Sequence, residues 1–199
     1  MSPGALDVRR AGAELRVRQR RGAIALAGRE SRRVLSLWTQ TILPSVITAA
    51  LFLAVFGGAL GARIRHVQGL PYLSFILPGL LVMTVAGQSF ANAATSLFQA
   101  KNEGYLEDVL SSPLRPLQIA LSYLSGGLLR GLLAGGIVAA GCVPFAREGA
   151  EPELAALALV LTGVVFSSLG VITAIWAETF DQHAFVANIV ITPLALVGG

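Results

Sequence analysis

Long apolar runs alternate with short polar connections along the chain, and this pattern predicts helices that cross a membrane. Residues 37–60 hold no charged side chain, and the later runs hold one, Arg130. A hydrocarbon layer about 30 Å thick requires roughly 20 apolar residues in a helix. Backbone groups in lipid must be satisfied internally, and the alternating polarity of a membrane barrel is missing. We predict helical spans at 37–60, 71–98, 117–145, 154–176 and 184–199.

Composition supports the membrane class. The 199 residues are 54% hydrophobic and 13% charged, whereas soluble domains carry about one quarter charged residues. The single cysteine, Cys142, lies in an apolar run and excludes a disulfide within one chain. We therefore expect an all-α, polytopic membrane helix bundle.

Charge is concentrated at the start of the chain. Residues 1–36 contain nine arginines and three acids. Beside a membrane span, anionic lipid headgroups explain such an arm better than nucleic acid does. Basic residues near span ends stay in the cytoplasm, so we expect a cytoplasmic N-terminus and a cytoplasmic loop at 100–116. Arg63 and Arg65, in a connection expected outside, oppose this orientation weakly.

The basic arm also suggests an interfacial element. In residues 23–36, we expect an amphipathic helix whose apolar side chains (Ile24, Leu26, Val34 and Leu35) face lipid and whose basic ones (Arg29, Arg32 and Arg33) face the headgroups. A solvated basic tail is an equally open prediction for residues 1–20. A transit peptide over residues 1–22 is a less favoured alternative.

Arg130 is the charge expected inside a span. It follows the start of its span by about 13 residues, or roughly 20 Å, which is too deep for simple snorkelling. Two interpretations stay open: a lining residue of a transport path, or a structural ion pair or carbonyl cap. Around it, Gly127, Gly131 and Gly135 lie four residues apart on one helix face, a spacing that lets helices approach closely. The partner could be another span or another subunit.

The loop at 100–116 is the most polar internal stretch. Two acids, Glu103 and Glu107, and two leucines, Leu106 and Leu110, recur at helical spacing. Pro113 and Pro116 follow and would end such a helix. We predict a short helix across the membrane face, suited to a soluble partner. From the residues alone, an ordinary solvated loop is the favoured alternative.

No catalytic or cofactor site is indicated. A phosphate-binding loop requires glycines followed by lysine and Ser or Thr, but Asn102 follows the sole lysine, Lys101. Two histidines, His66 and His183, the latter beside Asp181, do not complete a zinc site. We expect no bound metal, no cofactor and no enzymatic activity of this chain.

Two stretches resemble the ABC-2 type permease family, the membrane subunits of ATP-driven exporters. The segment from Tyr72 to Ile119 begins "YLSFILPGL" and continues into "EGYLEDVLSSP". It resembles the family's second span and following loop. The stretch "GGLLRGLL" resembles the start of the third span. The resemblance covers roughly residues 30–199.

The resemblance implies six membrane helices, of which about five are present here, so the chain looks C-terminally truncated. It implies that the loop forms a coupling helix that docks on an ATPase subunit. By match, this helix would include Glu103, Gly104, Glu107, Leu110 and Pro113. The implied partners are that ATPase, a second permease copy in a homodimer or heterodimer, and the lipid bilayer. ATP and Mg would bind the ATPase and not this chain.

The implied function is ATP-driven export of a drug, lipid or glycan-type substrate across the cytoplasmic membrane. An ion-coupled carrier or channel is one alternative, but it predicts acids inside the spans, and none of the eleven acids lies there. A non-transport membrane scaffold is another, and it predicts tolerance of changes at Glu103 and Glu107. An intramembrane enzyme is disfavoured because no catalytic cluster is apparent.

Overall fold

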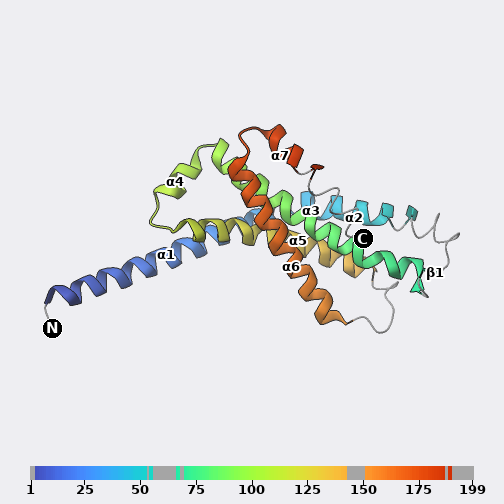
Figure 1. Cartoon of the computed structure of the whole chain (residues 1–199), viewed down its shortest axis with the longest axis horizontal. Helices are drawn as coiled ribbons and strands as arrows, with labels where there is room; N and C mark the ends of the chain where they lie inside the picture. Colours follow the sequence, from blue (N-terminus) through green and yellow to red (C-terminus); the bar gives the residue numbers. More distant parts are fainter. Residues whose placement is uncertain are drawn as a thin grey trace.

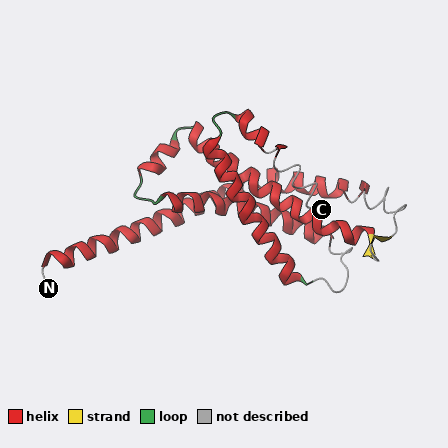
Figure 2. Ribbon diagram, viewed as in Figure 1, coloured by secondary structure: helices red, strands yellow, loops and turns green. Residues whose placement is uncertain are grey.

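A computed structural model describes residues 3–52, 54–55, 66–67, 70–142, 151–186 and 188–189. Helices dominate these residues, and two short strands form a small hairpin (Figure 2). The elements are α1 (Pro3–Ser36), α2 (Trp38–Phe52), β1 (His66–Val67), β2 (Leu70–Pro71), α3 (Tyr72–Asn102), α4 (Tyr105–Ser111), α5 (Pro116–Cys142), α6 (Pro152–Trp176) and α7 (Phe180–Val186). The all-α membrane bundle predicted from the sequence is confirmed.

Within the described residues, three helices are long and apolar enough to cross a membrane: Ser74–Asn102, Pro116–Gly141 and Pro152–Trp176. A fourth candidate is the pair Glu14–Ser36 and Trp38–Phe52, which is bent by 72°. Helix α2 ends at Phe52, and most of the remainder of the first predicted span lies outside the described residues. Most of the fifth predicted span lies outside the described residues.

Helix α3 is the centre of the bundle and packs most extensively against α6 and α5. Small residues make this possible. A Cβ atom placed on Gly170 of α6 would lie 2.6 Å from the carbonyl oxygen of Phe90, and one on Gly127 of α5 would lie 2.7 Å from that of Ser89. Helices in a membrane associate through such close backbone approach.

The predicted glycine face of α5 therefore meets another span of the same chain. A Cβ on Gly131 would collide with the Ser89 hydroxyl oxygen and lie 2.9 Å from the Val85 carbonyl oxygen. A Cβ on Gly135 would collide with the Val85 side chain. We call the contact of Gly127, Gly131 and Gly135 with α3 the glycine seam. It resolves the two alternatives in favour of an intramolecular contact.

Helix α1 runs beyond the bundle to the N-terminus (Figure 1). The prediction that its apolar side chains all face lipid was wrong for Leu26 and Val34, which are 8% and 2% exposed. Together with Glu30, they recur every four residues and form one face of α1, which packs mainly on α5. Ile24 and Leu35 are exposed, as predicted.

The two ends of the bundle differ in structure. The β1–β2 hairpin, which pairs His66 with Pro71, lies at one end, and α4 lies at the other (Figure 1). His66 is the first residue of the two-residue strand β1. Polar and charged contacts between α1, α3 and α4 gather at the α4 end, which is therefore the candidate functional site.

Candidate coupling site at the α4 end

Helix α4 follows a sharp turn after α3. Helix α3 ends at Asn102, and Gly104 has φ +81°, in the left-handed region that glycine enters without a steric penalty. The next residue, Tyr105, begins α4, which ends at Ser111 before Pro113. The short helix predicted in this loop is confirmed. Pro116 does not end α4 but is the first residue of α5, a position where its missing N–H costs nothing.

One side of α4 packs on the bundle and the other is exposed. Tyr105, Leu106 and Val109 pack against the buried cluster formed by α1, α3, α5 and α6. Glu107 and Asp108 are exposed in the first turn, and Leu110 is 60% exposed. No residue of α4 is fully buried. The helix is thus held along one edge and offers acids and a leucine to its surroundings.

Helix α1 braces α4 from the side. The Arg29 guanidinium lies 4.4 Å from the centre of the Tyr105 ring, a cation–π contact. Burial raises the pKa of the Tyr105 hydroxyl above its usual range, and the neighbouring Arg29 opposes this shift. Leu114, after α4, approaches α1 so closely that a Cβ on Gly22 would lie 3.0 Å from it. Arg29, which was predicted to face lipid headgroups, is exposed and also contacts the protein.

A second contact joins α1 to α3 through buried polar groups. Glu30 is 1% exposed, accepts a hydrogen bond of 2.5 Å from the Ser96 hydroxyl, and pairs with Arg33 at 3.4 Å. Arg33 also donates to the side-chain oxygen of Asn92 at 3.1 Å. A buried carboxylate requires such partners to offset its lost hydration. We call Glu30, Arg33, Asn92 and Ser96 the polar junction.

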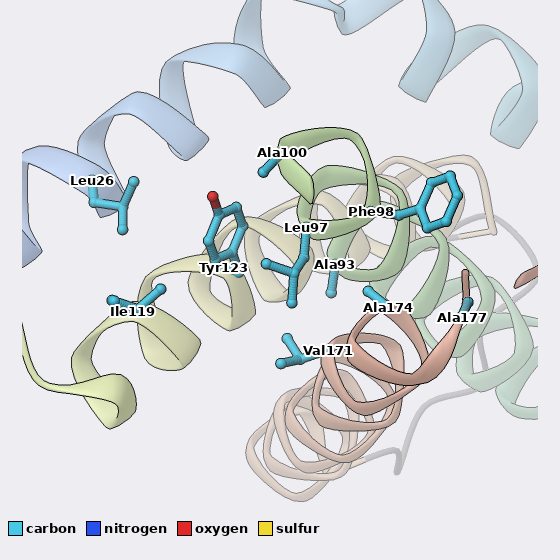
Figure 3. Close-up of a cluster of buried hydrophobic side chains, with 10 residues drawn as sticks. All are labelled: Leu26, Ala93, Leu97, Phe98, Ala100, Ile119, Tyr123, Val171, Ala174 and Ala177. Atoms are coloured by element: carbon cyan, nitrogen blue, oxygen red, sulfur yellow. The ribbon is translucent and has the colours of Figure 1, made fainter. Parts of the chain in front are cut away.

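The polar junction lies against α5 as well. A Cβ on Gly126 would lie 3.0 Å from the Cβ atom of Glu30 and 3.4 Å from the Asn92 amide nitrogen. Tyr123, one turn earlier on α5, is fully buried in the cluster beside Leu26 and Leu97 (Figure 3). Among the described residues, neither the Tyr123 hydroxyl nor the Asn92 amide nitrogen has a hydrogen-bond partner. The small size of Gly126 leaves room for a carboxylate between three helices.

Arg130 lies apart from α4, half-buried in the bundle. Its Nε donates to the Gln88 side-chain oxygen at 3.1 Å, and its Nη2 donates to the Gln40 carbonyl oxygen at 3.2 Å. Gln40 stands four residues before Pro44, which lacks the N–H that would bond this carbonyl within α2. Arg130 thus caps a carbonyl freed by proline, as the structural interpretation requires. A role in a transport path stays a prediction.

The structure brings together some predicted residues and adds others. Of the residues that the resemblance placed in the coupling helix, Glu107 and Leu110 lie in α4, whereas Glu103, Gly104 and Pro113 lie outside its bounds. Lys101 donates to the Ala177 carbonyl oxygen at 3.0 Å, just after the end of α6. Sequence reasoning missed Glu30, Asn92, Ser96 and Gly126, and it assigned Arg33 to the headgroups although Arg33 bonds Asn92 and pairs with Glu30. One signal was present, because Glu30 stands four residues from both Leu26 and Val34 on a face that is otherwise apolar.

Comparison with known proteins assigns the chain to a family. The profile of the family described as ABC-2 type transporter matches residues 22–199. The inner membrane transport permease YadH of Escherichia coli K12 is 38% identical over 172 residues, which are 86% of this chain and 67% of YadH. Nodulation protein J of Rhizobium leguminosarum bv. trifolii is 26% identical over 180 residues, covering 84% of this chain and 66% of that protein. No solved structure matches the chain. The chain belongs to the ABC-2 type transporter family.

Proposed function

We propose that this chain is the transmembrane permease subunit of an ATP-driven export system and that α4 docks on a separate ATPase subunit. Family membership and the similarity to a protein named a transport permease support the general class. The observation that carries the docking role is α4 itself, a short helix with no buried residue at one end of the bundle. Its exposed acids suit a basic groove on a soluble partner.

The connections of α4 explain how such a partner would act on the spans. Helix α4 joins α3 through Gly104 and joins α5 through residues 112–115. Arg29 adds a lateral contact to α1. A displacement of α4 would therefore reach three helices at once, and two of them span the membrane. Coupling between an ATPase and the spans requires an element with two positions whose balance both of them change, and α4 is suited to be that element.

The remaining parts of the system are proposals of the same kind. The nine arginines before residue 37 favour a cytoplasmic N-terminus, which places α4 in the cytoplasm beside the ATPase. ATP and Mg would bind that partner. A second permease copy, identical or related, would complete the path. The cargo would be a drug, lipid or glycan-type molecule.

Charge reversal on α4 tests the docking role. Glu107→Lys should abolish co-purification with the ATPase encoded beside the gene, because it places a cation where the basic groove expects a carboxylate. Glu153→Lys is the matched control, since Glu153 is exposed in the first turn of α6 and α6 reaches the α4 end only with its last turn. Membrane insertion should be unchanged in both variants. Equal recovery of the ATPase with wild type and Glu107→Lys would count against docking through α4.

Orientation is tested independently of the partner. In a Cys142→Ser background, Ser111→Cys should react with a membrane-impermeant maleimide only after the cytoplasmic side is exposed. Labelling of intact cells from outside would place α4 on the wrong side of the membrane for any ATPase contact.

A further inference from the structure

A cavity of about 340 Å³ lies beneath α4, between α3, α4, α5 and α6. Eleven residues line it, and Lys101 is the one charged residue among them. Leu97 and Val171 form part of its inner wall, and Leu106 and Leu110 of α4 cover it. Cavities of this size with apolar walls and a single charged group are typical of small-molecule sites.

The cavity lies at the level where the spans end. Helix α3 ends at Asn102, α5 begins at Pro116 and α6 ends at Trp176, and all three ends surround it. Ile175, which lines the cavity, is 65% exposed, and its neighbour Trp176 is 64% exposed. Tryptophan is enriched at the boundary between headgroups and acyl chains. A membrane boundary at Trp176 would bring the exposed, apolar Ile175 wall of the cavity to the depth of the lipid headgroups.

Lys101 supplies the polar end of the site. Its ammonium donates to the carbonyl oxygens of Ala177 at 3.0 Å and Ile175 at 3.4 Å. In the described part of the chain it has no carboxylate within ion-pair distance. An ammonium has three donors, so one is left for a phosphate oxygen.

We propose that this cavity binds one acyl chain of a membrane phospholipid whose phosphate contacts Lys101. The apolar walls fit the hydrocarbon, and the single cation at the mouth fits the phosphate. Only the choice of leaflet rests on the proposed function, since α4 in the cytoplasm would place the site in the inner leaflet. A bound chain would lie directly under Leu106 and Leu110 and would set how closely α4 approaches the spans.

Photolabelling of the purified chain tests the proposal without any ATPase. The chain is reconstituted into phosphatidylcholine vesicles with a trace of phosphatidylglycerol that carries a diazirine near the end of one acyl chain. Adducts are mapped by mass spectrometry of peptides. We expect adducts at Leu97 and Val171, which face the cavity. Adducts confined to exposed positions of α6 such as Val165 and Ile172 would show surrounding lipid only and would overturn the proposal.

Two variants sharpen the result. Ala120→Phe fills the cavity, and if the ring displaces about two methylene groups, cavity labelling should fall about ten-fold. Ala140→Phe, exposed on the same helix, is the control and should label like wild type. Lys101→Gln should lower the preference for the phosphatidylglycerol probe over an equivalent diacylglycerol probe about five-fold. If Ala120→Phe leaves cavity adducts unchanged, or cross-links within the protein replace them, no lipid chain occupies the cavity.

Because the assay contains no ATPase, its outcome is separate from that of the docking experiment. Circular dichroism melts of each variant show whether it folds, and Lys101→Gln, which keeps a donor for the α6 carbonyls, tests the site even if Ala120→Phe does not fold.

Discussion

The glycine seam and the polar junction both fasten a helix to α3, but they use opposite means. In the seam, α5 approaches α3 so closely that Cβ atoms on its glycines would collide with α3. In the junction, α1 contacts α3 through a carboxylate, a guanidinium, an amide and a hydroxyl. The seam depends on shape and permits one register. The junction depends on directional bonds, and Arg33 also donates to the Gln99 side-chain oxygen at 3.5 Å.

This difference agrees with position. The seam lies within the spans and is formed by glycines, backbone and small side chains, two of which, Ser89 and Ser167, keep buried hydroxyls without a hydrogen-bond partner among the described residues. The junction lies near the α4 end, where Arg33 keeps 25% of its side chain exposed and can remain partly hydrated. We infer that the seam holds the spans as one body, whereas the junction lets α1 adjust when α4 moves.

The largest effect is expected from filling the seam. Gly131→Val should lower the free energy of unfolding by about 3 kcal/mol, because the added methyl groups meet the Val85 carbonyl, which the helix backbone holds in place. Unfolding in mixed micelles measures it. A Cβ on Gly136 of the same helix would meet nothing within 4 Å, so Gly136→Val should be neutral or slightly stabilising, since valine favours helix over glycine. Equal losses in the two variants would refute packing at the seam.

Removing the carboxylate from the junction should cost less. Glu30→Ala should lower the free energy of unfolding by about 2 kcal/mol, because Ser96 and Arg33 lose a charged partner while Arg33 keeps Asn92 and some water. Hydrogen exchange should rise in α1 and not in α5. Glu14→Ala, at an exposed site of the same helix, is the control. A loss as large as that of Gly131→Val would contradict the contrast between the two regions.

A smaller effect tests the Arg130 cap. Arg130→Leu should cost about 1 kcal/mol more in the wild type than in a Pro44→Ala background, where the substituted alanine supplies the N–H that the Gln40 carbonyl lacks within α2. The bond from Arg130 to Gln88 is present in both backgrounds and cancels. A double-mutant cycle measures the difference. Zero coupling would mean that the carbonyl does not depend on Arg130.

The smallest effect concerns the contact between α1 and α4. Because burial raises the pKa of Tyr105, the folded state binds its proton more tightly than the unfolded chain does. The resulting stability is complete below the unfolded pKa of about 10. It declines as the pH rises through the folded value. The protection of α4 amides from hydrogen exchange, relative to their intrinsic exchange rate at each pH, should therefore fall above about pH 10. Tyr105→Phe should remove this step in protection. A step of equal size in Tyr105→Phe would assign it to another group.

The sequence predicted the parts whose physical cause is local. Apolar run lengths indicated α3, α5 and α6, and glycine spacing indicated the seam, although not its partner. The spacing of acids and leucines indicated α4, whereas the turn before it was not predicted, and its cause is the positive φ of Gly104. Arg130 was recognised as exceptional, but its target was not. Arg130 meets the Gln40 carbonyl that Pro44 leaves free only because α2 and α5 lie side by side.

The polar junction could not be predicted in the same way. Composition places a glutamate among three arginines in water or at headgroups, and burial of Glu30 depends on Gly126, which is 96 residues away in sequence. The assignment of Leu26 and Val34 to lipid failed for the same reason. An amphipathic face predicts which residues share a side of a helix, but not whether lipid or protein covers that side.

The four-residue stride of Leu26, Glu30 and Val34 limits how this chain can vary in length. Inserting one residue between positions 26 and 34 would rotate everything on one side of the insertion by roughly 100° about the helix axis. With the insertion between Leu26 and Glu30, Glu30 would turn away from Ser96 while Leu26 still faced α5, or Leu26 would turn away from α5 while Glu30 still faced Ser96. Upstream of residue 14, the same insertion would only lengthen the part of α1 that extends beyond the bundle. Tolerance of indels should therefore change abruptly along a single uninterrupted helix, and deep insertion scanning would locate that boundary.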